Sequence, residues 1–187
     1  MRYRNLLRSF VIVIIIITAL NFLNIIRLFY PLQYSEHIMT YSEKYDLSPY
    51  LVAAVIKTES NFRPNAKSPK NAHGLMQITS STAEWAAKEM NLENYSVEML
   101  KDPEFNIRMG CWYLDNLNKE FNDNTDLVLA AYNGGRGNVQ KWLSDLNHSK
   151  DGKNLYYIPF KETDKYIKRV KVNYNIYKLL YGERFNE

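Results

Sequence analysis

Residues 48–60 read Ser48-Pro49-Tyr50-Leu51-Val52-Ala53-Ala54-Val55-Ile56-Lys57-Thr58-Glu59-Ser60, an apolar run that ends in a carboxylate. Ser48 is a typical N-cap and Pro49 suits the first helical position, where a missing N–H costs nothing. Four residues fall at helical spacing and share one face: Val52, Val55, Ile56 and Glu59. Apolar surroundings and the negative end of the helix dipole both raise a carboxyl pKa. Glu59 is therefore a candidate proton donor at neutral pH, although an isolated Glu at a helix end is usually solvated.

The chain beyond this helix also has helical patterns, with no convincing alternating strand. Pro64 and Pro69 mark a loop that extends to about residue 73. Ser81-Thr82-Ala83-Glu84 is a capping box that opens a helix, and Asp102-Pro103 starts another. The expected helices are 34–45, 48–60, 81–90, 102–121, 125–134, 137–145 and 162–181, with a polar stretch at 147–154. The predicted fold class is mainly α.

The first thirty residues differ from the rest of the chain. Arg2, Arg4 and Arg8 precede a run without any charge from Ser9 to Ile26. This is about the length, roughly 20 residues, that a membrane-spanning helix needs. Positive residues before the span predict a cytoplasmic N-terminus and an exported remainder. A cleaved signal peptide is the alternative, but the residues after the run lack the small-residue pattern of a cleavage site, which favours an uncleaved single-pass anchor.

The charge balance disfavours a nucleic-acid partner. Four of the 24 basic residues lie within residues 1–30, which hold no acid, so 20 basic residues face 20 acidic ones in the remainder. The exported part is therefore neutral. The three histidines, His37, His73 and His148, are isolated from one another and expected at the surface. We therefore expect neither a metal site nor a cofactor.

Four short blocks accompany the glutamate. They are Glu59-Ser60, Gly74-Leu75-Met76-Gln77, Ala130-Ala131-Tyr132-Asn133-Gly134-Gly135 and Glu162-Thr163-Asp164-Lys165-Tyr166. In this order the blocks resemble the lytic transglycosylase catalytic domain of bacterial cell-wall enzymes, which is the soluble lytic transglycosylase type of glycoside hydrolase family 23. That family is distantly related to goose-type lysozyme. The resemblance covers about residues 45–181 and implies a lysozyme-like helical fold with a groove for glycan strands.

The resemblance also assigns roles to individual residues. Glu59 matches the catalytic acid, Ser68 a serine near the cleaved sugar, and Gln77 a glutamine that contacts substrate. Tyr132 and Asn133 match the pair beside the catalytic carboxylate, with Tyr132 expected to hydrogen-bond to it. Asn133 and Gln77 are expected to hold acetamido groups, and Glu162 matches a glutamate that supports the site. Weaker candidates are Met76, Thr79 and Tyr166. Family members often have Met-Pro where Thr79-Ser80 stand here, so Thr79 offers a hydroxyl at that position.

The implied reaction is lytic cleavage of peptidoglycan between N-acetylmuramic acid and N-acetylglucosamine, leaving a 1,6-anhydro end. Most glycosidases use two carboxylates. The segment between Ser60 and Ala83 contains no Asp or Glu, which suits a reaction in which Glu59 acts first as acid and then as base. Two alternatives remain: a goose-type hydrolase of the same bond, and a catalytically idle wall-binding module of a membrane-anchored assembly.

The expected organisation has three parts. Residues 1–30 form a basic cytoplasmic start and a transmembrane signal anchor, and residues 31–44 form a juxtamembrane linker or helix. Residues 45–187 form the catalytic domain on the extracytoplasmic side of the cell membrane. The expected partners are peptidoglycan glycan strands and the membrane itself.

Overall fold

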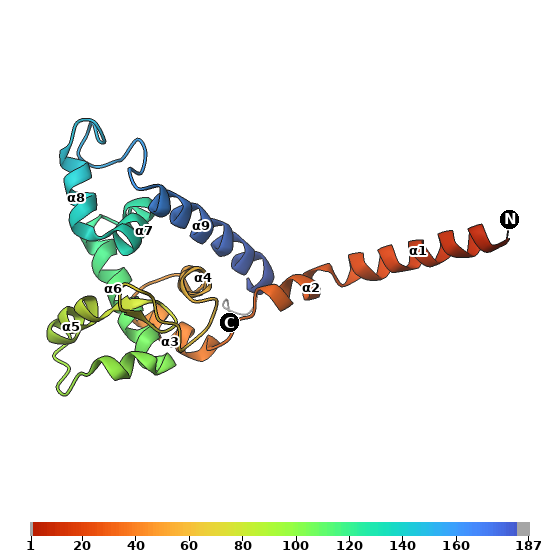
Figure 1. The fold of residues 1–187 in the computed structure, drawn as a ribbon, viewed down its shortest axis with the longest axis horizontal. Helices are drawn as coiled ribbons and strands as arrows, with labels where there is room; N and C mark the ends of the chain where they lie inside the picture. Colours follow the sequence, from red (N-terminus) through yellow and green to blue (C-terminus); the bar gives the residue numbers. More distant parts are fainter. Residues whose placement is uncertain (1, 183–187) are drawn as a thin grey trace. The chain divides into compact units, whose positions relative to one another are not determined.

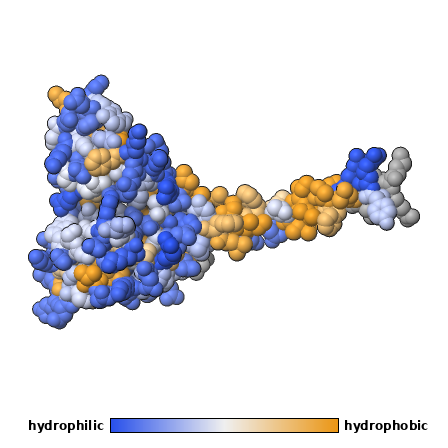
Figure 2. Space-filling model, viewed as in Figure 1, coloured by the Kyte–Doolittle hydropathy of each residue, from blue (hydrophilic) through white to orange (hydrophobic). Residues whose placement is uncertain are grey.

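The computed structural model describes residues 2–182, which fall into two compact units, one up to residue 32 and one from residue 33 onward. The first unit contains α1 (Arg2–Leu20) and α2 (Phe22–Phe29). Most of its described apolar side chains are exposed and none is buried, and Figure 2 shows hydrophobic residues covering these helices. Within residues 2–182, no single helix meets the length and hydropathy needed to cross a membrane. Two consecutive helical segments satisfy the length and hydropathy requirements only when taken together, namely Phe10–Leu20 and Phe22–Phe29, with a bend of 61° between them. The expected single spanning helix is therefore not confirmed.

The second unit is mainly helical. Figure 1 shows its elements in order: α3 (Ser35–Lys44), α4 (Pro49–Glu59), β1 (Ala72–His73), β2 (Ile78–Thr79), α5 (Ser80–Glu89), the 3-10 helix η1 (Val97–Lys101), α6 (Pro103–Glu120), α7 (Thr125–Gly134), α8 (Arg136–Ser144) and α9 (Lys161–Tyr181). The expected helices are confirmed to within about two residues, as is usual for helix ends. Helix η1 was not anticipated.

The core forms where α4 packs against α9 and α9 packs against α7. Helix α4 is short and almost wholly apolar, so it is buried on most of its surface, with Val52, Val55 and Ile56 fully inaccessible to solvent. Burial of aliphatic side chains on this scale is the main stabilising contribution to a small helical domain. The end of α4 that carries Glu59 is thereby held at the edge of this core.

Three local expectations were wrong. A small antiparallel pair, β1 with β2, exists in a region where no strand was expected. Helix α5 begins two residues earlier than the capping box suggested: Thr79 rather than Ser81 is the N-cap, and its hydroxyl accepts a hydrogen bond from the Thr82 N–H at 3.2 Å. His73, expected at the surface, is 8% exposed because it lies in β1.

Candidate active site

Glu59 is the last residue of α4 and lies partly buried at the edge of the core. Burial raises the pKa of its carboxyl group to about 7, and the negative charge of Glu162 acts in the same direction. The Tyr166 hydroxyl opposes the shift by favouring the ionised form. The direction expected from the sequence is therefore confirmed, and desolvation is its main cause. A carboxyl group with this pKa exchanges a proton readily near neutral pH.

Two tyrosines accompany the carboxyl group. Burial, together with the negative charge of Glu59, raises the pKa of both Tyr132 and Tyr166 well above the ordinary value. Both therefore stay protonated and can act only as neutral hydroxyl groups at working pH. The buried Tyr166 hydroxyl makes no hydrogen bond of normal geometry within residues 2–182. After burial itself, the charge of Glu59 is the largest influence on its pKa.

A cleft of about 300 Å³ opens beside Glu59. Seven of the nine residues singled out from the sequence line it: Glu59, Ser68, Gln77, Thr79, Tyr132, Asn133 and Glu162. The other two, Met76 and Tyr166, do not line it but are buried in the core. Pro69, Lys70 and Ala72 complete the lining, and none of them had been singled out as a site residue. The structure thus brings together residues separated by more than a hundred positions.

Backbone contacts hold the polar groups on one side of the cleft in place. Gln77 has a left-handed backbone with φ of 49°, and its Nε2 donates to the carbonyl oxygens of Gly74 at 2.9 Å and Ala66 at 3.1 Å. The Ser68 Oγ accepts hydrogen bonds from the backbone N–H groups of Lys70 and Ala72, both at 3.2 Å. These bonds leave the Gln77 amide oxygen and the Ser68 O–H for a ligand.

The other wall of the cleft is formed by the end of α7 and the start of α9. Thr163 Oγ1 donates to Asn133 Oδ1 at 2.8 Å, which fixes the Asn133 amide. The Tyr132 hydroxyl donates to the Met76 carbonyl oxygen at 2.7 Å. The expected hydrogen bond from Tyr132 to Glu59 is therefore wrong: Tyr132 instead ties α7 to the loop before β2. Thr163, which the sequence did not single out, positions Asn133.

One buried side chain holds the loop between the two strands. Asn106 of α6 is fully inaccessible to solvent. Its Oδ1 accepts from the Met76 N–H at 2.8 Å, and its Nδ2 donates to the carbonyl oxygens of His73 and Leu100, both at 2.9 Å. Gly74 must lack a side chain here, since a Cβ would lie 2.1 Å from the Asn106 Nδ2. Asn106 therefore positions Gln77 indirectly.

Thr79 combines two roles. It lines the cleft, and its hydroxyl is already engaged as the cap of α5 and as the donor to Thr82 Oγ1 at 2.8 Å. The Thr79 hydroxyl, which was expected to face substrate, instead caps the N-terminus of α5. Among residues 2–182, no group of three or more His, Cys, Asp or Glu side chains could hold a metal ion.

The second unit has a mainly helical, lysozyme-like fold, as the solved structures that resemble it show. The 70 kDa soluble lytic transglycosylase from Escherichia coli superposes with a TM-score of 0.73 at 32% identity, covering 82% of this chain and 25% of that one. The lytic transglycosylase Slt from Pseudomonas aeruginosa has a TM-score of 0.71 at 30% identity, covering 80% and 24%.

The sequence comparisons define the family. Residues 36–155 match the Transglycosylase SLT domain, and the chain belongs to that family. The soluble lytic murein transglycosylase of Salmonella typhimurium is 34% identical over 157 residues, which cover 83% of this chain and 24% of that protein. The membrane-bound lytic murein transglycosylase C of Shigella sonnei is 36% identical over 113 residues, covering 56% and 32%. The chain thus spans about a quarter of the length of the soluble relatives it matches.

Proposed function

We propose that this chain is a peptidoglycan lytic transglycosylase that cleaves the β-1,4 bond between N-acetylmuramic acid and N-acetylglucosamine. The observation that carries the proposal is the partly buried carboxyl group of Glu59, which has a pKa of about 7 and lines a cleft together with amide and hydroxyl groups. Family membership and the names of the relatives support the same substrate class.

The proposed reaction needs one carboxyl group. Glu59 donates its proton to the glycosidic oxygen while the bond from that oxygen to the muramic acid C1 breaks. The sugar's own acetamido group stabilises the positive charge that develops at C1. The ionised Glu59 then takes the proton of the C6 hydroxyl, and the C6 oxygen bonds to C1. The carboxyl group is regenerated, and no water is consumed. A pKa near working pH suits both steps.

A second candidate is hydrolysis of the same bond. It is favoured by one observation: Glu162 also lines the cleft, and its charge acts on Glu59. An inverting hydrolase needs a second carboxylate to activate water. The sequence segment after Glu59 offers none, but α9 supplies Glu162 from a distance of about a hundred residues along the chain.

Product chemistry separates the two reactions. We expect digestion of purified peptidoglycan by the full chain in detergent to release muropeptides with 1,6-anhydromuramic ends. These products are lighter by one water than the reducing-end products of hydrolysis and resist reduction by borohydride. Mass spectrometry before and after borohydride treatment identifies the ends. A digest in which all new ends are reducible would rule out the lytic reaction and favour hydrolysis.

The N-terminal unit is proposed to anchor the protein in the cell membrane. In this proposal residues 1–30 form the signal anchor, 31–44 a juxtamembrane segment and 45–187 the catalytic domain on the extracytoplasmic side. The exposed apolar side chains and the uncharged run from Ser9 to Ile26 support it. The full chain should stay with carbonate-washed membranes and be digested by protease added outside spheroplasts; recovery in the soluble fraction would contradict the anchor.

A further inference from the structure

A second hollow, of about 310 Å³, lies on another side of α9 from the catalytic cleft. The start of α7, the segment 154–158 and one face of α9 form its walls. On α9 it is lined by Asp164, Lys168 and Lys171, whereas Glu162 lines the catalytic cleft. At 3.6 residues per turn, these three residues lie roughly half a turn around the helix from Glu162. The hollow, which we call the α7–α9 hollow, is therefore a separate surface.

The lining of the α7–α9 hollow combines aromatic, aliphatic and amide groups. The Tyr157 ring is 54% exposed, and an edge-on contact with the His148 ring, at 5.4 Å between centroids, holds it in place. Leu127 and Ile158 add apolar surface, and Asn124 adds an amide. Flat apolar faces beside hydrogen-bonding edges are the chemistry that sugar rings require.

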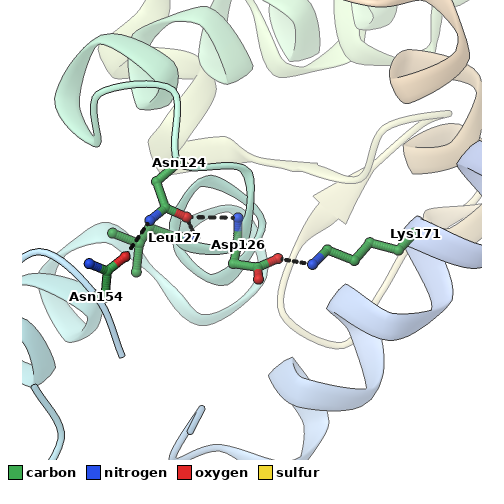
Figure 3. Close-up of polar contacts among 5 residues, drawn as sticks. All are labelled: Asn124, Asp126, Leu127, Asn154 and Lys171. Carbon is green, nitrogen blue, oxygen red and sulfur yellow. Dashed lines mark hydrogen bonds and ion pairs between the residues drawn. The ribbon is translucent and has the colours of Figure 1, made fainter. Parts of the chain in front are cut away.

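The amides of the hollow are fixed before any ligand arrives. Figure 3 shows Asn124 accepting from the backbone N–H groups of Asp126 and Leu127 while its Nδ2 donates to Asn154 Oδ1 at 3.3 Å. Asn154 Nδ2 donates in turn to Asp151 Oδ2 at 2.8 Å. Within residues 2–182, each amide nitrogen thus uses one of its two N–H groups, which leaves one donor on each for a ligand. Such preorganisation lowers the entropy lost on binding.

The charges around the hollow cancel. Asp126 pairs with Lys171 across the two helices (Figure 3), and Lys168 pairs with Asp164 at 2.7 Å. Two acids and two bases give no net charge, and each charged group already has its partner. An anionic or cationic ligand would have to displace one of these partners, so the hollow favours an uncharged one.

A neighbouring cavity of about 360 Å³ lies between α6, α8 and the loop before α9. Asn124, Leu127 and Asn154 line both cavities, so the paired amides lie where the two meet. Each cavity is in the size range of small-ligand sites, which begins at roughly 300 Å³. Two adjoining sites of this size suit consecutive units of a polymer.

We propose that the α7–α9 hollow is an accessory binding site for an uncharged glycan chain of N-acetylated sugars. The acetamido groups would meet the free amide donors of Asn124 and Asn154, and one sugar face would stack on Tyr157. The inference rests on the proposed function, in which the same polymer is the substrate. Binding here holds the enzyme on the insoluble wall without using the catalytic cleft.

The test measures binding of the full chain carrying Glu59→Gln, in detergent, by co-sedimentation with purified sacculi and with chitin, an insoluble and uncharged polymer of N-acetylglucosamine. Adding Tyr157→Ala is expected to weaken binding to both polymers about tenfold. Tyr157→Phe keeps the ring and should bind like its parent. The matched control is Leu146→Ala, which removes a side chain that is 81% exposed and lies outside both cavities.

Three results would overturn the accessory site. The first is equal binding by the Tyr157→Ala and Leu146→Ala chains. The second is that Tyr157→Ala weakens binding to sacculi but not to chitin, which indicates a peptide ligand. The third is no binding of the parent to either polymer. With Glu59 intact, Tyr157→Ala should cleave a short soluble muropeptide at an unchanged rate. Failure of the proposed function would show separately, as absence of cleavage by the unmutated chain.

Discussion

Replacing Glu59 by Gln is expected to lower the rate of muropeptide release from purified peptidoglycan by about 10³-fold or more. Gln keeps the size of the side chain and can fill the same place at the end of α4, but it cannot give or take a proton. Because Glu59 is proposed to act in both proton transfers, no partial route through the remaining residues is expected. The measurement is the initial rate of soluble muropeptide release by the full chain in detergent.

The matched control for this variant is Glu89→Gln, which removes an exposed carboxylate on α5 and should leave the rate unchanged. Thermal unfolding of both variants checks that the fold survives. The Gln variant should be no less stable than the unmutated protein at neutral pH, because a partly buried carboxyl group costs stability when it ionises. Full activity of Glu59→Gln would refute the assigned role, and inactivity of the unmutated protein would favour the idle wall-binding module.

Replacing Asn106 by Ala is expected to destabilise the domain by about 3–5 kcal/mol. The substitution removes three hydrogen bonds at a fully buried position. It leaves the Met76 N–H and the carbonyl oxygens of His73 and Leu100 without their partner, and each unsatisfied buried group costs about 1–3 kcal/mol. Urea unfolding followed by circular dichroism measures the loss.

The same variant tests whether Asn106 positions the cleft. Even where the protein remains folded, the loop that carries Gln77 should loosen, so activity should fall while the Glu59 side chain is unchanged. Asn175→Ala, at an exposed position on α9, is the matched control and should change stability by less than about 0.5 kcal/mol. A loss below about 1 kcal/mol for Asn106→Ala would show that the buried network is not needed to hold this loop.

Local patterns in the sequence were sufficient to predict most of the helices. Apolar residues at helical spacing and cap-plus-proline starts such as Ser48-Pro49 and Asp102-Pro103 lie within a few residues of one another, so a single chain reveals them. The direction of the Glu59 pKa shift could also be predicted, because the apolar residues of α4 mark this helix for burial and desolvation is the main cause of the shift. Of the seven predicted site residues that line the cleft, Glu59 was also marked by a physical pattern, and the other six followed from the family resemblance.

Very short elements and contacts between distant parts of the chain could not be predicted. The β1–β2 pair has only two residues in each strand, which is too short for an alternating pattern. Asn106 lies thirty residues from Met76, and nothing in its neighbours marks a buried amide that binds backbone groups. Thr79 rather than Ser81 caps α5 because its backbone leaves β2 at that point. The hydrogen bond from the Tyr132 hydroxyl to the Met76 carbonyl oxygen could not be predicted either, because only the folded chain brings these two residues together.

The titration of the Glu59 carboxyl group tests most directly whether one partly buried carboxyl group serves as acid and base. Carbon-13 NMR of the chain labelled at glutamate side-chain carboxyls follows each resonance with pH, and the spectrum of Glu59→Gln identifies the one that belongs to Glu59. Burial in the cleft predicts a midpoint at about 7. A midpoint near 4.5, the ordinary value for a solvated glutamate, would show that Glu59 is ionised throughout the neutral range and would contradict its role as proton donor.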